Sequence, residues 1–86
     1  MEIYYRELKP IYNVIDLRDK IDYDLGHYIN SINIPYNHLL SNPSKYLDKS
    51  KIYYLYCKSG IRSRKATELL SLLGYKIVNV KDGYNK

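Results

Sequence analysis

The sequence predicts an α/β fold, a small open parallel sheet flanked by helices. Short apolar runs with the composition of buried strands recur along the chain, and a segment with helical spacing lies between two of them. The segments that join these elements are short. A strand, a helix and a strand in this order form a βαβ unit, in which the two strands are parallel. We therefore expect one parallel sheet with helices packed against it.

Four runs indicate strands. Residues 13–17 form an apolar run that opens with Asn and closes with charge, and residues 31–34 form a weaker run ahead of a proline. Residues 52–56 are continuous and aromatic, and residues 76–80 are rich in β-branched side chains. At the start of the chain, Ile3 and Tyr4 can form at most a small edge strand.

One helix is strongly indicated and two shorter ones are expected. Within residues 63–73, leucines and an alanine recur at helical spacing, and Gly74 supplies a stop. The shorter helices are expected at residues 21–25, ending near Gly26, and at residues 36–40.

Length and composition indicate one domain over residues 1–86. The chain has 86 residues, of which 45% are hydrophobic and 27% charged, values of an ordinary globular domain. A multidomain enzyme and a disordered tail are therefore excluded, and a single cysteine excludes an internal disulfide. The absence of a signal-peptide pattern and the lone thiol favour a cytoplasmic location.

The net charge of +5 comes mostly from lysines scattered along the chain among acidic residues. This spread favours a solvated surface, so we expect no nucleic acid partner. No apolar run approaches the ~20 residues of a membrane span, so we expect no membrane partner either. Twelve Tyr with no Phe and no Trp suggest that tyrosines fill the core.

The candidate site is the segment 57–62, Cys-Lys-Ser-Gly-Ile-Arg, between the strand 52–56 and the helix expected from Ser63. In open α/β sheets, ligands bind at the carboxyl ends of strands, and a tight loop entering a helix presents backbone N–H groups to an anion. These groups and the neighbouring cations favour the nucleophilic thiolate of Cys57. The alternative is that Cys57 is a small buried hydrophobe, which does not explain the cations around it.

Several segments together resemble the rhodanese-like domain family, the single-domain sulfurtransferases. Asp-Leu-Arg at 16–18 is similar to the family's Asp-x-Arg, and the segment 26–35 resembles its Gly-His-Ile to Asn-Ile-Pro pattern. The segment 57–62 is similar to the family's catalytic loop. Gly-Tyr at 74–75 and Val-Lys-Asp-Gly at 80–83 resemble the closing pattern, so the similarity extends over nearly the whole chain.

The resemblance implies a sulfurtransferase of the thiosulfate sulfurtransferase type. Catalytic Cys57 would take a sulfane sulfur from a small anionic donor and pass it, as a persulfide, to a thiol or protein persulfide acceptor. Arg62 and Lys58 would hold the donor, and no cofactor is implied. The full set of expected substrate-binding residues is Lys58, Ser59, Gly60, Ile61 and Arg62.

Three further residues are expected to support the site structurally. Arg18 and Asp22 are spaced i to i+4, and the resemblance also implies a structural ion pair for Arg18. Asp16 is expected to fix a loop, and His27 to make a structural hydrogen bond rather than activate the thiol. No metal is expected, because Cys57 and the histidines lack short ligand spacing.

Two other functions stay open. Related phosphatases and arsenate reductases have a catalytic loop one residue longer, whereas four residues separate Cys57 from Arg62 here. A noncatalytic interaction module is the other alternative, although the cysteine is retained. The chain lacks the family's usual C-terminal helix after Gly83, so we also expect an exposed edge that could favour a homodimer.

Overall fold

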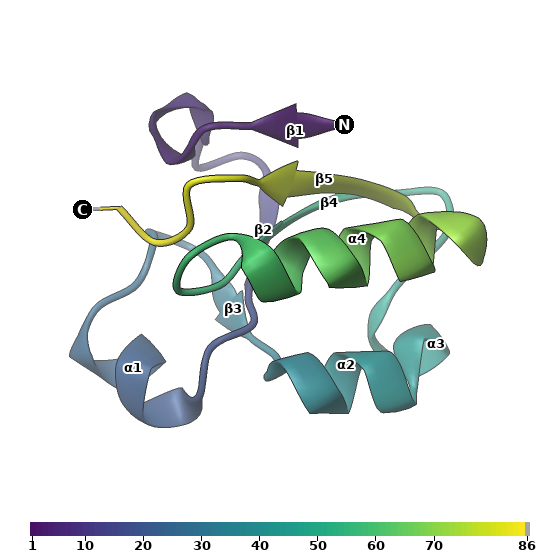
Figure 1. Cartoon of the computed structure of the whole chain (residues 1–86), viewed down its shortest axis with the longest axis horizontal. Coiled ribbons are helices and arrows are strands. Elements are labelled where there is room, and N and C mark those ends of the chain that lie inside the picture. The colour runs from purple at the N-terminus through teal and green to yellow at the C-terminus, as the bar shows by residue number, and fades with distance from the viewer. Residues whose placement is uncertain (86) are drawn as a thin grey trace.

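The computed structural model describes residues 1–85 and contains one parallel sheet, which confirms the predicted fold class. The sheet has five strands in the order β1-β5-β4-β2-β3, and every neighbouring pair is parallel (Figure 1). The strands are β1 (Glu2–Ile3), β2 (Asn13–Asp16), β3 (Ile32–Asn33), β4 (Ile52–Tyr56) and β5 (Lys76–Val80).

Helices follow the strands in alternation, as predicted, but the main helix begins earlier than expected. It starts at Ile61 rather than Ser63, because Gly60 adopts φ +91° and completes the turn within four residues of the strand. The 3-10 turn η1 and helix α3 were not predicted, although the proline at the first position of α3 is a helix-start signal. The helical elements are η1 (Tyr5–Glu7), α1 (Lys20–Leu25), α2 (Tyr36–Ser41), α3 (Pro43–Tyr46) and α4 (Ile61–Leu72).

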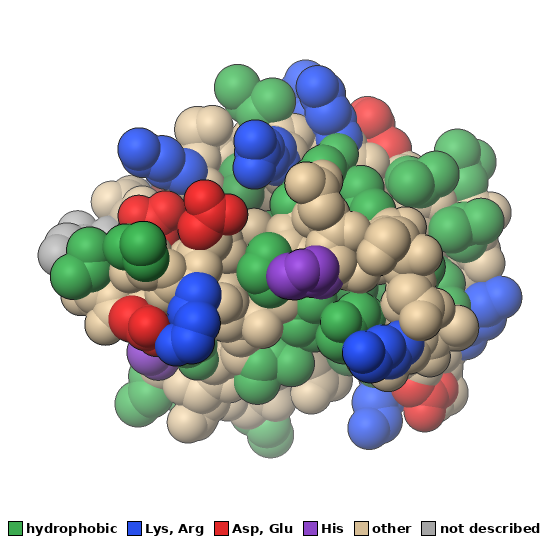
Figure 2. All heavy atoms as spheres, turned by 90° about the horizontal axis from the view of Figure 1, so that it is seen from below, with side chains coloured by type: hydrophobic (Ala, Val, Ile, Leu, Met, Phe, Trp, Pro, Cys, Tyr) green, Lys and Arg blue, Asp and Glu red, His purple; other side chains and the backbone are tan. Residues whose placement is uncertain are grey.

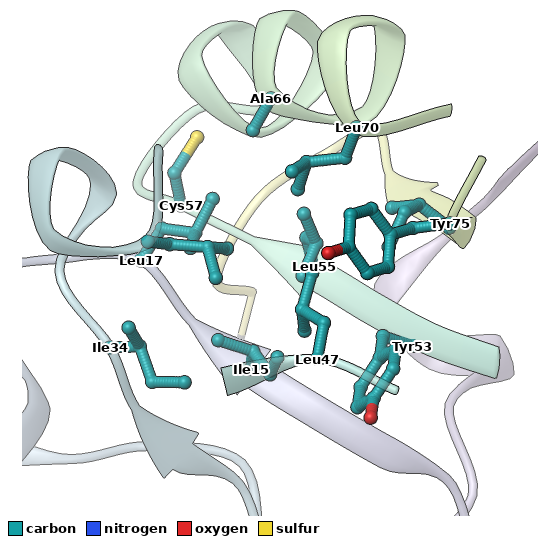
Figure 3. Close-up of a cluster of buried hydrophobic side chains, with 12 residues drawn as sticks. Ile15, Leu17, Ile34, Leu47, Tyr53, Leu55, Cys57, Ala66, Leu70 and Tyr75 are labelled. Carbon is teal, nitrogen blue, oxygen red and sulfur yellow. The ribbon is translucent and has the colours of Figure 1, made fainter. Parts of the chain in front are cut away.

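The larger hydrophobic cluster lies between the sheet and helices α2 and α4. Successive side chains of a strand point to opposite faces, so Tyr53, Leu55 and Cys57 all turn toward this side. From α4, Ala66 and Leu70 complete the cluster (Figure 3). Leu55 and Leu70 have no exposed surface, so β4 is fixed firmly just before the candidate site.

Tyrosines form much of the opposite face of the sheet. The ring of Tyr5 makes edge contacts with the rings of Tyr28, Tyr56 and Tyr84, at centroid distances of 5.6, 6.0 and 5.7 Å. Tyr56 has no exposed surface, and its hydroxyl accepts a hydrogen bond from the backbone N–H of Tyr28 at 3.0 Å. The expectation that tyrosines fill the core is confirmed for Tyr56 on this face and for Tyr53 and Tyr75 in the larger cluster.

The carboxylate of Asp16, at the end of β2, is fully buried and binds Arg18. Its oxygens accept hydrogen bonds from the backbone N–H of Arg18 at 2.8 Å and from Nη2 at 2.7 Å. Arg18 also donates to the carbonyl oxygen of Gly26. The expected pairing of Arg18 with Asp22 is wrong, because the guanidinium turns back toward the sheet to compensate the buried charge of Asp16.

No helix within residues 1–85 is long and apolar enough to cross a membrane.

Replacing Asp16 with Ala should destabilise the fold strongly. The Arg18 side chain, only 9% exposed, would lose its buried counter-charge, and such a loss costs about 3–5 kcal/mol. Asp24→Ala is the matched control: it removes the exposed pair between Lys20 and Asp24, which is worth less than about 0.5 kcal/mol. Urea unfolding followed by circular dichroism measures both. Equal losses in the two variants would contradict a central role for Asp16.

Candidate active site

Cys57 lies at the carboxyl edge of the sheet, directly after β4. Strand β4 is the middle strand of the sheet, with β5 on one side and β2 on the other, so the site stands at the end of a strand that is paired on both sides. Figure 3 shows the sulfur pointing from the sheet toward α4. Cys57 is only 4% exposed, yet it contributes to the lining of a surface pocket.

The loop backbone turns its N–H groups toward the Cys57 sulfur. The N–H of Gly60 donates to Sγ at 3.1 Å and the N–H of Ser63 donates at 3.4 Å. The hydroxyl of Ser63 lies 3.5 Å from the same sulfur. Burial raises the pKa of the Cys57 thiol, but hydrogen bonds from Ser63, Ser59 and Gly60 outweigh burial and hold this pKa below its ordinary value. The arrangement therefore favours a thiolate nucleophile.

Ser63 is a site residue that the sequence reasoning missed. Its side chain is fully buried, and its hydroxyl donates to the carbonyl oxygen of Gly60 at 3.2 Å while contacting the Cys57 sulfur. A serine in the first turn of the helix after the cysteine was visible in the sequence. Its contact with sulfur follows from the early start of α4, which places Ser63 over the loop.

Glycine is required at the centre of the loop. Gly60 has φ +91°, and a Cβ there would overlap the backbone carbonyl oxygen of Lys81. Gly83, with φ +71°, would in the same way overlap the carbonyl oxygen of Lys58. The loop and the turn after β5 therefore lie backbone against backbone.

Tyr84, the residue after this turn, is hydrogen-bonded to the backbone of Cys57. The backbone N–H of Tyr84 donates to the carbonyl oxygen of Cys57 at 2.9 Å. The Tyr84 ring lies under the guanidinium of Arg18, whose central carbon is 4.1 Å from the ring centroid. Arg18 and Asp16 thus stabilise the site through Tyr84, a contact that the sequence did not reveal.

Four of the five expected substrate-binding residues line the Cys57 pocket. These are Lys58, Ser59, Ile61 and Arg62, while Gly60 lies beneath the sulfur as a hydrogen-bond donor. The central carbon of the Arg62 guanidinium is 5.6 Å from the centroid of the Tyr36 ring on α2. The binding roles of these residues stay predictions, because the lining of a pocket shows where a residue lies and not what it binds.

The opposite wall of the pocket comes from the segment that leads into α1. Leu17, Arg18, Asp19 and Asp22 line it, and the two exposed carboxylates were not among the predicted site residues. Nothing in the sequence indicated that either carboxylate lies at the pocket, because only the fold brings α1 beside the loop.

His27 contacts Tyr23 and is not part of the lining of the Cys57 pocket. Its Nδ1 is 2.7 Å from the carbonyl oxygen of Tyr23, and its ring stacks on the Tyr23 ring with centroids 3.7 Å apart. This geometry fits the expected structural hydrogen bond. Within residues 1–85, no three His, Cys, Asp or Glu side chains are grouped so that they could hold a metal ion.

The fold and the site define a class: a small parallel α/β domain with a cysteine held in a loop of N–H donors at the end of a central strand. Residues 4–86 match the Rhodanese-like domain family, and the chain belongs to that family.

Solved structures of similar sequence have the same fold. The Rhodanese-like domain protein of Staphylococcus aureus is 32% identical, with a TM-score of 0.76, and the match covers 90% of this chain and 74% of that one. A rhodanese-related protein from Thermoplasma volcanium is 42% identical, also with a TM-score of 0.76, and the match covers 84% of this chain and 71% of that one.

Several curated relatives are much longer than this chain. The tRNA uridine(34) hydroxylase of Buchnera aphidicola is 32% identical over 79 residues, which are 85% of this chain but 25% of that protein. The uncharacterized protein YqhL of Bacillus subtilis is 32% identical over 74 residues, again 85% of this chain and 58% of the relative. The chain thus spans a quarter to somewhat over half of their length.

Gly60→Ala should destabilise the protein more than the same change at Gly74. Both positions have positive φ, which costs alanine about 1–2 kcal/mol, but only Gly60 faces a backbone oxygen, and such overpacking adds about 1–3 kcal/mol. At Gly74 the nearest atom is the flexible Lys49 Nζ, 3.5 Å from the added Cβ. Urea unfolding compares the two variants, and a smaller loss at Gly60 would show that the loop does not depend on this close approach.

Ser63→Ala should raise the pKa of the Cys57 thiol, because it removes the side-chain hydrogen bond that helps to lower it. Alkylation by iodoacetamide, followed across pH, should therefore reach half its maximum at a higher pH and be slower at neutral pH. Ser59→Ala is the matched control, since Ser59 acts on the sulfur through its backbone N–H, which alanine keeps. An unchanged pH profile for Ser63→Ala contradicts this role of the hydroxyl.

Proposed function

We propose that this protein is a sulfurtransferase that carries a sulfane sulfur as a persulfide on Cys57. The observation that carries the proposal is the pair of backbone N–H groups, of Gly60 and Ser63, that donate to Sγ at 3.1 and 3.4 Å. The Ser63 hydroxyl lies 3.5 Å from Sγ, and hydrogen bonds in this loop lower the pKa of the buried thiol. The same donors can stabilise a persulfide anion formed at this position.

In the first step the Cys57 thiolate attacks the outer sulfur of an anionic donor such as thiosulfate. A bond forms between Sγ and that sulfur, and the sulfur–sulfur bond of thiosulfate breaks. The electron pair of the broken bond leaves with sulfite. Lys58 and Arg62, exposed at the pocket, supply positive charge for the anionic donor and for the departing anion.

In the second step a nucleophilic acceptor, such as a thiol or a protein thiol, attacks the outer sulfur of the persulfide. The bond between the two sulfurs breaks and its electron pair returns to Sγ, which regenerates the thiolate of Cys57. Neither step requires a metal or an organic cofactor.

The short loop supports sulfur transfer over phosphate chemistry. Four residues separate Cys57 from Arg62, and α4 begins at Ile61, directly after the turn at Gly60. The loop therefore closes tightly over the sulfur, with donors at 3.1 and 3.4 Å. This suits one added sulfur atom better than a tetrahedral phosphate group.

The hydroxylases among the relatives are named for a reaction on tRNA uridine, and this chain matches a quarter of the length of the Buchnera protein. We assign to this chain the cysteine chemistry of the shared domain and no tRNA substrate. A lone cysteine that must return to a free thiolate after each transfer is consistent with a reducing compartment such as the cytoplasm.

The persulfide is directly testable. Treatment of the purified protein with thiosulfate or polysulfide should add one sulfur atom to Cys57, as seen by mass spectrometry of the intact protein and of its peptides. Cys57→Ser should show no addition, because the protein has no other cysteine. If no donor adds sulfur to Cys57 under conditions in which the thiol is alkylated readily, the sulfurtransferase function is wrong.

A further inference from the structure

The pocket around Cys57 carries acidic as well as basic side chains. Lys58 and Arg62 belong to the loop and the start of α4, whereas Asp19 and Asp22 belong to the entry and the first turn of α1. All four are exposed. Figure 2, which views the face with α1 and α2, shows acidic side chains beside basic ones at one end of the molecule.

The two carboxylates lack partners within the described chain. Among residues 1–85, the ion pairs are those of Arg18 with Asp16 and of Lys20 with Asp24. Arg18 also lines the pocket, but Asp16 already compensates its charge. Asp19 and Asp22 are therefore available to a cationic group of a ligand at the pocket.

These charges restrict which molecule can meet the sulfur of Cys57. Lys58 and Arg62 line one side of the pocket and Asp19 and Asp22 the other, with no ion pair between the two sets among residues 1–85, and the thiolate or persulfide adds a further negative charge. A negative group of a ligand is favoured beside Lys58 and Arg62 and repelled on the α1 side of the pocket. A ligand that carries an ammonium group near its thiol is attracted there, since opposite charges within a few ångströms stabilise each other.

We propose that the acceptor of the Cys57 persulfide is a small aminothiol, whose ammonium group binds Asp19 and Asp22 while its sulfur approaches Cys57. This inference rests on the proposed sulfurtransferase function and names the acceptor class. If the aminothiol also has a carboxylate, Lys58 and Arg62 are placed to bind it, as the two sets of charges line the same pocket.

The transfer step balances without a co-reactant. The thiol proton of the acceptor passes to the outer sulfur of the Cys57 persulfide, and the acceptor thiolate then forms a bond to that sulfur. The bond between this sulfur and Sγ breaks, and its electron pair remains on Sγ. The products are the aminothiol persulfide and the Cys57 thiolate. The ammonium group lowers the repulsion between the attacking thiolate and the negative charges of the pocket.

A single-turnover experiment tests the proposal. Protein carrying the Cys57 persulfide, freed of excess polysulfide, is mixed with cysteamine, cysteine, 2-mercaptoethanol or 3-mercaptopropionate, and loss of the added sulfur is followed by mass spectrometry. Each rate is divided by the thiolate concentration, because the four thiols differ in acidity. Cysteamine and cysteine should then react faster than neutral 2-mercaptoethanol, and 3-mercaptopropionate should react more slowly than cysteine.

Variants of Asp19 and Asp22 test whether these carboxylates cause the preference for aminothiols. Asp19→Asn and Asp22→Asn should each slow cysteamine about threefold, the effect of one exposed ion pair, and should leave 2-mercaptoethanol unchanged. Asp24→Asn is the matched control, because Asp24 lies on the same helix but pairs with Lys20 and is absent from the pocket lining. A general disturbance of the fold would slow all four thiols alike.

The outcomes separate the two proposals. Absence of any persulfide on Cys57 overturns the sulfurtransferase function and the aminothiol inference with it. A persulfide that reacts with cysteamine and 2-mercaptoethanol at equal corrected rates overturns the aminothiol inference alone. A preference for cysteamine that survives in the Asp19→Asn, Asp22→Asn double variant overturns the assignment to these two residues.

Discussion

The close packing of the cysteine loop against the turn after β5 is the constraint on which the site depends. Gly60 lies against the carbonyl of Lys81, and Gly83 lies against the carbonyl of Lys58, at distances that leave no room for a side chain. The N–H of Tyr84 then binds the carbonyl of Cys57. These contacts fix the backbone of the loop on both sides. The N–H groups of the loop are thereby held pointing toward the sulfur.

The buried pair of Asp16 and Arg18 extends this constraint to the neighbouring strand. Removing a carboxylate from water is costly, and the guanidinium repays that cost only because it reaches the Asp16 oxygens at 2.7 to 3.1 Å. The same guanidinium covers the Tyr84 ring. A polar pair at the end of β2 thereby holds the segment that binds Cys57 at the end of β4. The position of the sulfur is therefore fixed by β4, by β2 and by the turn after β5.

Local patterns predicted much of this arrangement. The bounds of β4 and β5 agree with the sequence, because β4 is a continuous apolar run and β5 is rich in β-branched side chains. The start of α4 was missed by two residues, since it depends on the positive φ of Gly60, which lies against Lys81 in the turn after β5. The partner of Arg18 was mistaken because helical spacing pointed to Asp22, whereas burial of Asp16 decides the pairing. Asp19 and Asp22 reach the pocket only through the tertiary fold.

The site divides its chemistry between the backbone and the side chains. Backbone N–H groups and the buried hydroxyl of Ser63 stabilise the thiolate, and they act at short distance where water is excluded. The charged side chains Lys58 and Arg62 are exposed, as are Asp19 and Asp22, so solvent screens their effect on the sulfur while they remain available to a ligand. A change of an exposed charge should therefore alter which donor or acceptor is used without removing the nucleophile. By the same reasoning, a change that displaces the backbone of Gly60 or Ser63 acts on the nucleophile itself, whichever sulfur compound is supplied.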